Sequence, residues 1–169
     1  MKIKSLNKKM CTEKRIIMEE FKPVVFKLGD RKFGIDISKV QGIEREQHIV
    51  PVPNTEDYII GIMNLRGDVI PVYSLKKKFN IEAVNSQPQY IITWIKNNTI
   101  ALEVDGVDEI QAVEESMLHN VPSIIGSGDT GYMDRIVSNG KDLIIIINSD
   151  GLLTDDELER IDNIVKSQS

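Results

Sequence analysis

Residues 60–73 of the chain read IGIMNLRGDVIPVY, two apolar arms on either side of the turn sequence Arg66-Gly67-Asp68. Short β-branched arms that flank a glycine turn are typical of an antiparallel hairpin. Pro71 lacks the N–H that a strand ladder needs, so it indicates an edge strand or a bulge in the second arm. We therefore predict a strand over 60–65, an exposed turn and a second strand over 69–73.

Two further segments have the character of hairpins. Residues 24–28 and 33–37 are apolar runs around a Gly-Asp turn, and residues 91–95 and 100–104 are similar runs around an Asn-Asn turn. Runs of this length between turn residues predict strands. The chain therefore begins its ordered part with a hairpin and repeats one about halfway along.

An internal repeat links these hairpins. Adding 67 to each position places residues 33–37 on residues 100–104, and the correspondence continues without a gap as far as Ile43. Residues 69–73 resemble residues 143–147 at an offset of 74, although the loops before them differ. Self-similarity of this kind indicates duplicated structural units. We predict two related β units.

The composition also favours sheet over helix. The chain has 169 residues, of which 41% are hydrophobic and only 5% aromatic, so its core should be aliphatic. The dense charges of residues 1–21 predict a flexible or weakly helical leader before a domain over 22–169.

The C-terminal end carries a helix signal. Thr154-Asp155-Asp156-Glu157 has the spacing of a capping box, and Leu158, Ile161 and Val165 follow at intervals of three and four. We predict a short helix over 154–166 whose apolar face packs on the sheets.

Charge and cysteine content limit the class of protein. The net charge is −5, and from Ile100 onward four Lys or Arg stand against fifteen Asp or Glu, which disfavours nucleic acid as a partner. The one cysteine, Cys11, cannot form an internal disulfide and predicts a reducing cytoplasm. No apolar stretch is long enough to span a membrane, so we expect neither export nor membrane insertion.

A catalytic or cofactor site finds little support in the sequence. Residues 126–131 read GSGDTG and match the pattern of dinucleotide-binding loops, but the residues that follow predict strands rather than the required helix. His48 and His119 have no Cys or second His at metal-ligand spacing. We therefore expect no catalytic residues, no metal and no cofactor, with nucleotide binding at the glycine loop as the alternative hypothesis.

The turn at Arg66 allows two interpretations. Gly67 can simply supply the positive φ that a tight turn requires. Alternatively, Arg66 offers a planar five-donor fork beside apolar Ile62, Leu65 and Val69, which is the mixed chemistry of binding hot spots. Physical reasoning alone leaves both open.

The same stretch resembles a known family signature. Residues 58–72, with the opening segments 26–29 and 33–37, the segment Val104-Asp105-Gly106-Val107 and the closing segment 143–153, are similar to the CheW family, the coupling proteins of bacterial chemotaxis. The resemblance covers about residues 21–158.

This resemblance implies a fold and a function. The fold is a pair of SH3-like, five-stranded β-barrels with a groove between them, residues 22–88 forming mostly the first barrel and 89–150 mostly the second. The implied function is a non-catalytic scaffold that links the cytoplasmic tip of chemoreceptors to the regulatory domain of the histidine kinase CheA. Such a protein is cytoplasmic and is recruited to membrane-associated receptor arrays. A docking half of a CheV-type protein is a further alternative, but the chain ends at Ser169 without a receiver domain.

The resemblance also implies site residues. The receptor-binding positions would be Val40, Ile43, Gly61, Asn64, Leu65, Arg66 and Gly67, and the kinase-binding surface would include Ile124. Two departures from the family pattern stand out. Gly42 replaces an acidic residue common in the family, and Gly140-Lys141-Asp142 reverses the usual order of the two charges.

Overall fold

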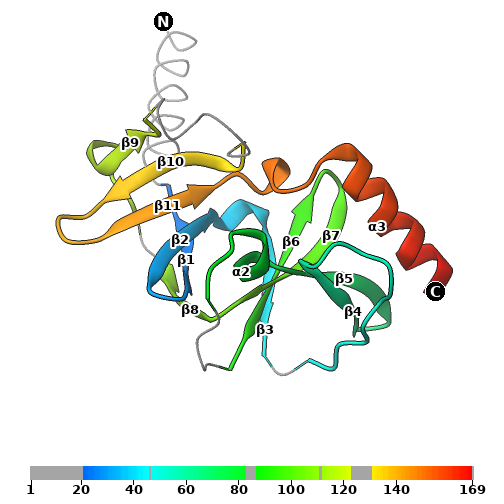
Figure 1. Cartoon of the computed structure of the whole chain (residues 1–169). Helices are drawn as coiled ribbons and strands as arrows, with labels where there is room; N and C mark the ends of the chain where they lie inside the picture. The colour runs from blue at the N-terminus through cyan, green and yellow to red at the C-terminus, as the bar shows by residue number, and fades with distance from the viewer. Residues whose placement is uncertain (1–20, 46, 83–86, 111, 123–130, 169) are drawn as a thin grey trace, which may run out of the picture.

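A six-stranded sheet contains strands from both ends of the chain. The computed structural model describes residues 21–45, 47–82, 87–110, 112–122 and 131–168 (Figure 1). The strands of this sheet lie in the order β8-β1-β2-β11-β10-β9. Their bounds are β1 Pro23–Leu28, β2 Arg31–Asp36, β8 Gly106–Ile110, β9 Leu118–Asn120, β10 Met133–Ser138 and β11 Leu143–Ile147.

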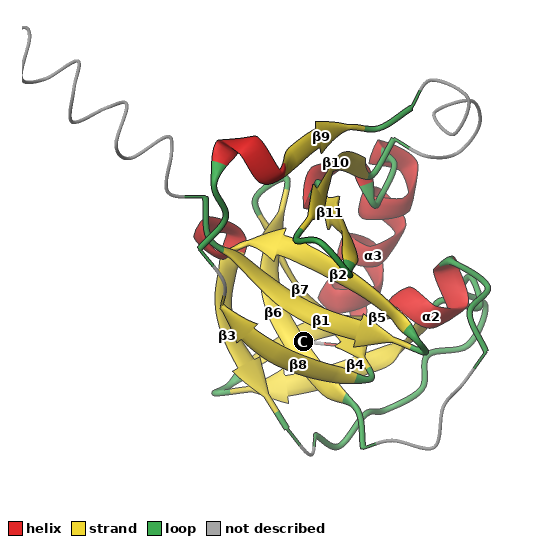
Figure 2. Ribbon diagram, turned by 90° about the vertical axis from the view of Figure 1, so that its left-hand side faces the viewer, coloured by secondary structure: helices red, strands yellow, loops and turns green. Residues whose placement is uncertain are grey.

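A five-stranded sheet contains the middle of the chain, in the order β3-β6-β7-β5-β4. Its strands are β3 Val40–Glu44, β4 Ile59–Leu65, β5 Asp68–Ser74, β6 Gln89–Ile95 and β7 Asn98–Val104. Four short helices follow β2, β5, β8 and β11: η1 Ile37–Lys39, α2 Leu75–Lys78, η2 Glu115–Met117 and η3 Ser149–Gly151. As Figure 2 shows, strands dominate the described part and the helices lie around them.

The two sheets confirm the predicted repeat. In each sheet an edge strand (β8 or β3) pairs antiparallel with the first arm of a hairpin (β1–β2 or β6–β7). The second arm of that hairpin pairs parallel with the next strand (β11 or β5). That strand closes a second hairpin, β4–β5 in one sheet and β10–β11 in the other. The offset of 67 relates β2 to β7, and the offset of 74 relates β5 to β11.

The repeat units, however, exchange hairpins, so each sheet contains strands from both sides of residue 88. The β1–β2 hairpin joins β8, β10 and β11 of the second unit, whereas the β6–β7 hairpin joins β3, β4 and β5 of the first. The reason is that the chain crosses to the other sheet after β2, through η1, and again after β7. One sheet also has six strands rather than five, because β9 pairs with β10.

Pro71 lies in β5, which is an interior strand rather than the predicted edge strand. It pairs with Ile62 of β4 and precedes the segment Val72–Ser74 that pairs with β7. The β7 ladder therefore requires no N–H at residue 71. The ladder is regular at Pro71, and its register shift lies between Ile59 and Gly61 on β4, so the bulge is in the first arm and not at Pro71 as predicted.

Three apolar clusters stabilise the fold. The largest lies between the sheets and includes Phe26, Ile35, Tyr73, Ile91 and Leu102. The other two lie on the opposite faces, one on each sheet. A buried Ile or Leu in such a cluster contributes about 2–5 kcal/mol relative to Ala. Strands covered on both faces, such as β1, β6 and β11, are almost continuously apolar.

A buried ion pair holds the crossover after β7. The side chain of Asp105 accepts a 2.6 Å hydrogen bond from the Gly29 N–H and lies 2.5 Å from Nζ of Lys76. The N–H of Asp105 also donates to the Lys27 carbonyl at 3.0 Å. One carboxylate thus connects the β1–β2 turn, the β7–β8 crossover and α2, which belong to different sheets.

The predicted C-terminal helix is present as α3, Asp155–Gln168. Its capping box forms as expected: Oε2 of Glu157 accepts from the Thr154 N–H at 2.7 Å, and Oγ1 of Thr154 accepts from the Glu157 N–H at 3.2 Å. Leu158 and Ile161 pack into the inter-sheet cluster. Among the described residues, no helix is both long and apolar enough to cross a membrane.

Candidate functional site

The tip of the β4–β5 hairpin holds an arginine in an unfavourable backbone conformation. Leu65 and Asp68 form the last pair of the ladder, and the two residues between them have φ values of 53° (Arg66) and 93° (Gly67). Two positive φ angles are those of a type I′ turn, which suits the twist of a hairpin. Gly67 adopts this conformation at little cost, whereas a non-glycine residue in it costs about 1 kcal/mol.

A side-chain hydrogen bond fixes the turn, since Oδ1 of Asn64 accepts from the Gly67 N–H at 3.0 Å. The Arg66 side chain is 86% exposed, and its NH2 nitrogen lies 3.7 Å from Oε1 of Glu44. The turn therefore presents the guanidinium to solvent from a strained backbone position. Strain at an exposed cation is a reason to suspect a binding role.

The Arg66–Glu44 contact joins the two edges of the five-stranded sheet, because β3 and β4 are its outermost strands. A second link lies further along the same edges. The backbone groups of Val50 and Ile62 exchange two hydrogen bonds of 2.9 Å. The segment that follows β3 is thus held against β4.

Gly61, a predicted receptor contact, lies inside this arrangement and is buried. A Cβ at this position would lie 2.3 Å from the Val50 carbonyl oxygen and 2.8 Å from Cγ2 of Ile49. The structure therefore explains the glycine by close backbone approach and not by surface exposure.

The two predicted positions on β3 differ in exposure. Val40 is half-buried and packs against the inter-sheet cluster, whereas Ile43 is 40% exposed. Gly42 pairs with Ile92 and Glu44 with Tyr90, so both residues face the same side of the strand. A Cβ at Gly42 would meet no atom within 4 Å, so packing does not require glycine there.

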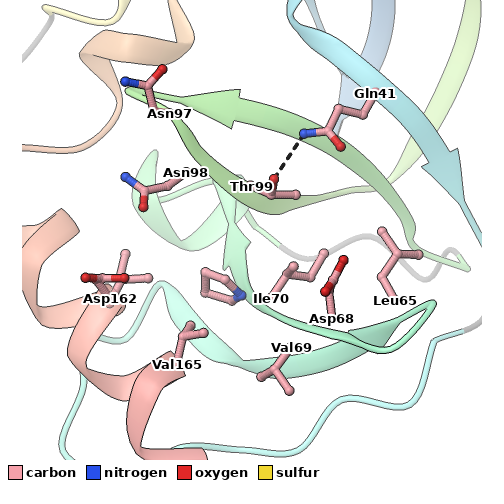
Figure 3. A pocket seen from close by; sticks show the side chains of 12 residues that line it. Gln41, Leu65, Asp68, Val69, Ile70, Asn97, Asn98, Thr99, Asp162 and Val165 are labelled. Carbon is pink, nitrogen blue, oxygen red and sulfur yellow. Dashed lines mark hydrogen bonds between the residues drawn. The ribbon is translucent and has the colours of Figure 1, made fainter. Parts of the chain in front are cut away.

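A hollow of about 330 Å³ opens beside the hairpin tip (Figure 3). The hairpin forms one wall, α3 forms another, and the start of β7 contributes polar side chains. The lining residues are Gln41, Leu65, Asp68, Val69, Ile70, Pro71, Asn97, Asn98, Thr99, Ile161, Asp162 and Val165. The side-chain amide of Gln41 donates to Oγ1 of Thr99 at 3.1 Å and so links β3 to β7. The hollow combines apolar surface with amide and carboxylate groups, a mixture that is suited to binding a segment of another protein.

The structure brings together only part of the predicted site. Asn64, Leu65, Arg66 and Gly67 share the hairpin tip, and Leu65 also lines the hollow. Ile124 lies outside the described residues, as do residues 126–130 of the glycine loop.

Sequence reasoning missed two parts of this surface. Glu44 was not singled out, although its place two residues after Gly42 puts it on the same side of a strand. The α3 residues Ile161 and Val165 were assigned to packing alone, and the helical spacing gave no sign that, together with Asp162, they also line a hollow.

Ion pairs shift the pKa values of several titratable groups among the described residues. Within the described residues, no group of three or more His, Cys, Asp or Glu side chains could hold a metal ion. The pKa values that depart from their ordinary range belong mainly to surface ion pairs. The hydrogen bond from Lys32 lowers the pKa of Asp142, and the hydrogen bond from Lys96 lowers the pKa of Asp155. Both carboxylates lie away from the hairpin tip in sequence and outside the hollow's lining.

The sequence is similar to a family of known proteins. A family model described as a CheW-like domain matches residues 22–157. The chemotaxis protein CheW of Klebsiella aerogenes is 28% identical over 146 residues, covering 85% of this chain and 88% of the relative. CheW of Treponema pallidum is 28% identical over 152 residues, covering 86% and 89%.

A solved structure extends the agreement to three dimensions. The scaffolding protein TtCheW from Thermoanaerobacter tengcongensis superposes with a TM-score of 0.75 at 32% identity, covering 82% of this chain and 95% of that one. The match takes in nearly the whole of the solved chain, and the family model spans all the described strands. This chain therefore belongs to the CheW family.

Proposed function

We propose that this protein is a non-catalytic scaffold that couples chemoreceptors to the histidine kinase CheA. The observation that carries the proposal is the strained, 86% exposed Arg66 at a hairpin tip beside a hollow of mixed chemistry. The relatives support it, since they are named as chemotaxis proteins and one as a scaffolding protein.

The proposal also includes the division of the fold into two barrels. We take each sheet to be an SH3-like barrel, formed by five strands in corresponding order. The links between β3 and β4 across the five-stranded sheet support this, because they bring its two edges together. The exchanged hairpins then tie the two barrels to each other.

The receptor tip would bind at the β4–β5 hairpin and the adjoining hollow. In this proposal Asn64, Leu65, Arg66 and Gly67 provide the rim, and Ile43 adds apolar surface on β3. Val40 and Gly61 contribute indirectly, by placing β3 and β4. The kinase regulatory domain would bind a separate surface that includes Ile124, a placement that rests on family resemblance. The protein would act in the cytoplasm, at membrane-associated receptor arrays.

A charge reversal at the tip tests the proposal. Arg66→Glu should weaken binding of a receptor-tip fragment by at least about five-fold, or about 1 kcal/mol, if Arg66 is a hot spot. Binding of the CheA regulatory domain should not change. Isothermal titration calorimetry with each partner measures both values.

Arg31→Glu is a matched control, because Arg31 is an exposed arginine beside the β1–β2 turn of the other sheet. It should leave receptor binding unaltered. A co-precipitation with both partners should recover all three proteins together. Unchanged receptor affinity in a folded Arg66→Glu variant would reject the receptor site, and failure to retain both partners would reject the coupling function.

A further inference from the structure

Two polar contacts join the base of the β4–β5 hairpin to α3. The hydroxyl of Tyr58 donates a hydrogen bond to Oε1 of Glu157. The guanidinium of Arg160 pairs with the carboxylate of Glu56 through NH1 and Oε1. Glu56 and Tyr58 directly precede β4, whereas their partners lie in the first half of α3. We call these two contacts the clamp.

The hairpin side of the clamp is bonded to both strands. The Ser74 N–H, at the end of β5, donates to the Tyr58 carbonyl at 2.7 Å. The Ile59 N–H, at the start of β4, donates to the Glu56 carbonyl at 2.9 Å. The Tyr58 ring also packs against Tyr73 of β5, with 4.9 Å between the ring centroids. The clamp residues therefore move together with the base of the hairpin.

On the helix side of the clamp, the Glu157 side chain is only 13% exposed. Its Oε1 lies 3.9 Å from Nζ of Lys78, and the same Nζ lies 4.7 Å from the centre of the Tyr58 ring. Its Oε2 accepts from the Thr154 N–H at 2.7 Å. One largely buried carboxylate thus connects the start of α3 to the hairpin and to α2.

The hollow lies beyond the clamp, toward the hairpin turn. It is lined there by Leu65, Asp68 and Val69 near the turn and by Ile161, Asp162 and Val165 on α3 (Figure 3). Burial of Leu158 and Ile161 attaches α3 to the inter-sheet cluster, but apolar burial has no preferred direction. Hydrogen bonds do have one. The angle between helix and hairpin therefore depends on the clamp.

We propose that Tyr58 and Glu56 are positioning residues of the binding surface. Through Glu157 and Arg160 they set the angle between α3 and the hairpin, and with it the width of the hollow. The inference rests on the proposed function, since it concerns the site proposed for the receptor tip. A hollow of set width binds more tightly than one that must be ordered on binding, because ordering costs free energy. Neither positioning residue lines the hollow or needs to touch the partner.

A variant without the clamp tests this role. Tyr58→Phe keeps the ring on Tyr73 and removes the donor to Glu157, and Arg160→Gln removes the charge that pairs with Glu56. In isothermal titration calorimetry the double variant should bind a receptor-tip fragment at least about three-fold more weakly, because α3 must then be ordered on binding. Its affinity for the CheA regulatory domain should not change.

Spin labels report the angle of α3 without any partner. Asn163 on α3 and Asp68 on the hairpin are both exposed and accept a label after substitution by cysteine. Cys11→Ser removes the one native cysteine, so that labels attach only at these two positions. Double electron–electron resonance should give a narrow distance distribution with the clamp intact and a broader one in the double variant.

Tyr90→Phe is a matched control. Tyr90 is a buried tyrosine of the same five-stranded sheet, and its hydroxyl interacts with a glutamate, Glu103, rather than with α3. Its loss can lower the Tm, but it should change neither the spin-label distances nor the receptor affinity. Thermal unfolding of every variant checks the fold, so a loss of stability is separated from a loss of positioning.

The outcomes distinguish this inference from the proposed function. An unchanged distance distribution in the folded double variant overturns the positioning role. A broadened distribution with unchanged receptor affinity also overturns it, in a protein where Arg66→Glu does weaken binding. If Arg66→Glu leaves receptor binding unchanged, the proposed receptor site is wrong and the role of the clamp in binding is rejected with it.

Discussion

Gly61→Ala should separate a structural role of this residue from a contact role. The new Cβ would lie 2.3 Å from the Val50 carbonyl oxygen, a distance that requires the backbone to move. The movement would break the two 2.9 Å hydrogen bonds between Val50 and Ile62. The alanine would also have to leave, or tolerate, a φ of 155°. We expect the segment after β3 to detach from β4.

The size of the effect follows from these contacts. Two backbone hydrogen bonds contribute about 1 kcal/mol each. The backbone strain adds about 1 kcal/mol or more. The free energy of unfolding should therefore fall by about 3 kcal/mol. For a chain of this length, that corresponds to a decrease in Tm of about 6–12 °C.

Urea unfolding followed by far-UV circular dichroism measures this loss. Gly42→Ala is the matched control, because a Cβ at Gly42 meets no atom within 4 Å and the substitution should change stability by less than about 0.5 kcal/mol. Receptor affinity should fall in Gly61→Ala through displacement of the hairpin. A loss of stability below about 1 kcal/mol would refute the close-approach argument. Lost receptor binding at full stability would show that Gly61 contacts the partner directly.

Two further predictions concern ion pairs that link distant segments. Asp105→Ala leaves the half-buried Lys76 without this carboxylate and removes the acceptor of the Gly29 N–H, so the free energy of unfolding should fall by about 3 kcal/mol in urea titration. A near-neutral result would show that the crossover does not need this pair. The hydrogen bond from Lys32 holds the pKa of Asp142 below its ordinary value, so the ion pair's contribution to stability is present above the ordinary pKa and disappears as the pH falls through the lowered one. Asp142→Asn should make Tm less dependent on pH below about 4; an identical pH profile would contradict this.

The sequence predicted local structure well, because local patterns specify it. The hairpin at Arg66 followed from the glycine turn and its apolar arms, and α3 followed from its capping box. The duplication could be found from two constant offsets. For the hairpin and the helix the informative residues are neighbours along the chain, so periodicity and turn chemistry are sufficient.

The exchange of hairpins could not be predicted in the same way. Whether β2 pairs with β11 or with β5 depends on contacts between residues about 110 or 40 positions apart, and both candidate partners are equally apolar. Gly61 illustrates the same limit at the site. Its burial depends on the approach of Val50, which no local pattern encodes.

The exchange also explains why the binding surface has no single sequence motif. The hairpin tip comes from the first unit, Thr99 comes from β7 of the second, and Val165 comes from α3 after both. Because each sheet needs strands from both units, neither unit can complete its own sheet. The walls from β3, the β4–β5 hairpin and β7 all belong to the five-stranded sheet, and the remaining wall, α3, is placed by its packing against the inter-sheet cluster. A scaffold built in this way positions its binding residues through the whole fold, with Asp105 and its partners fixing the crossover on which that position depends.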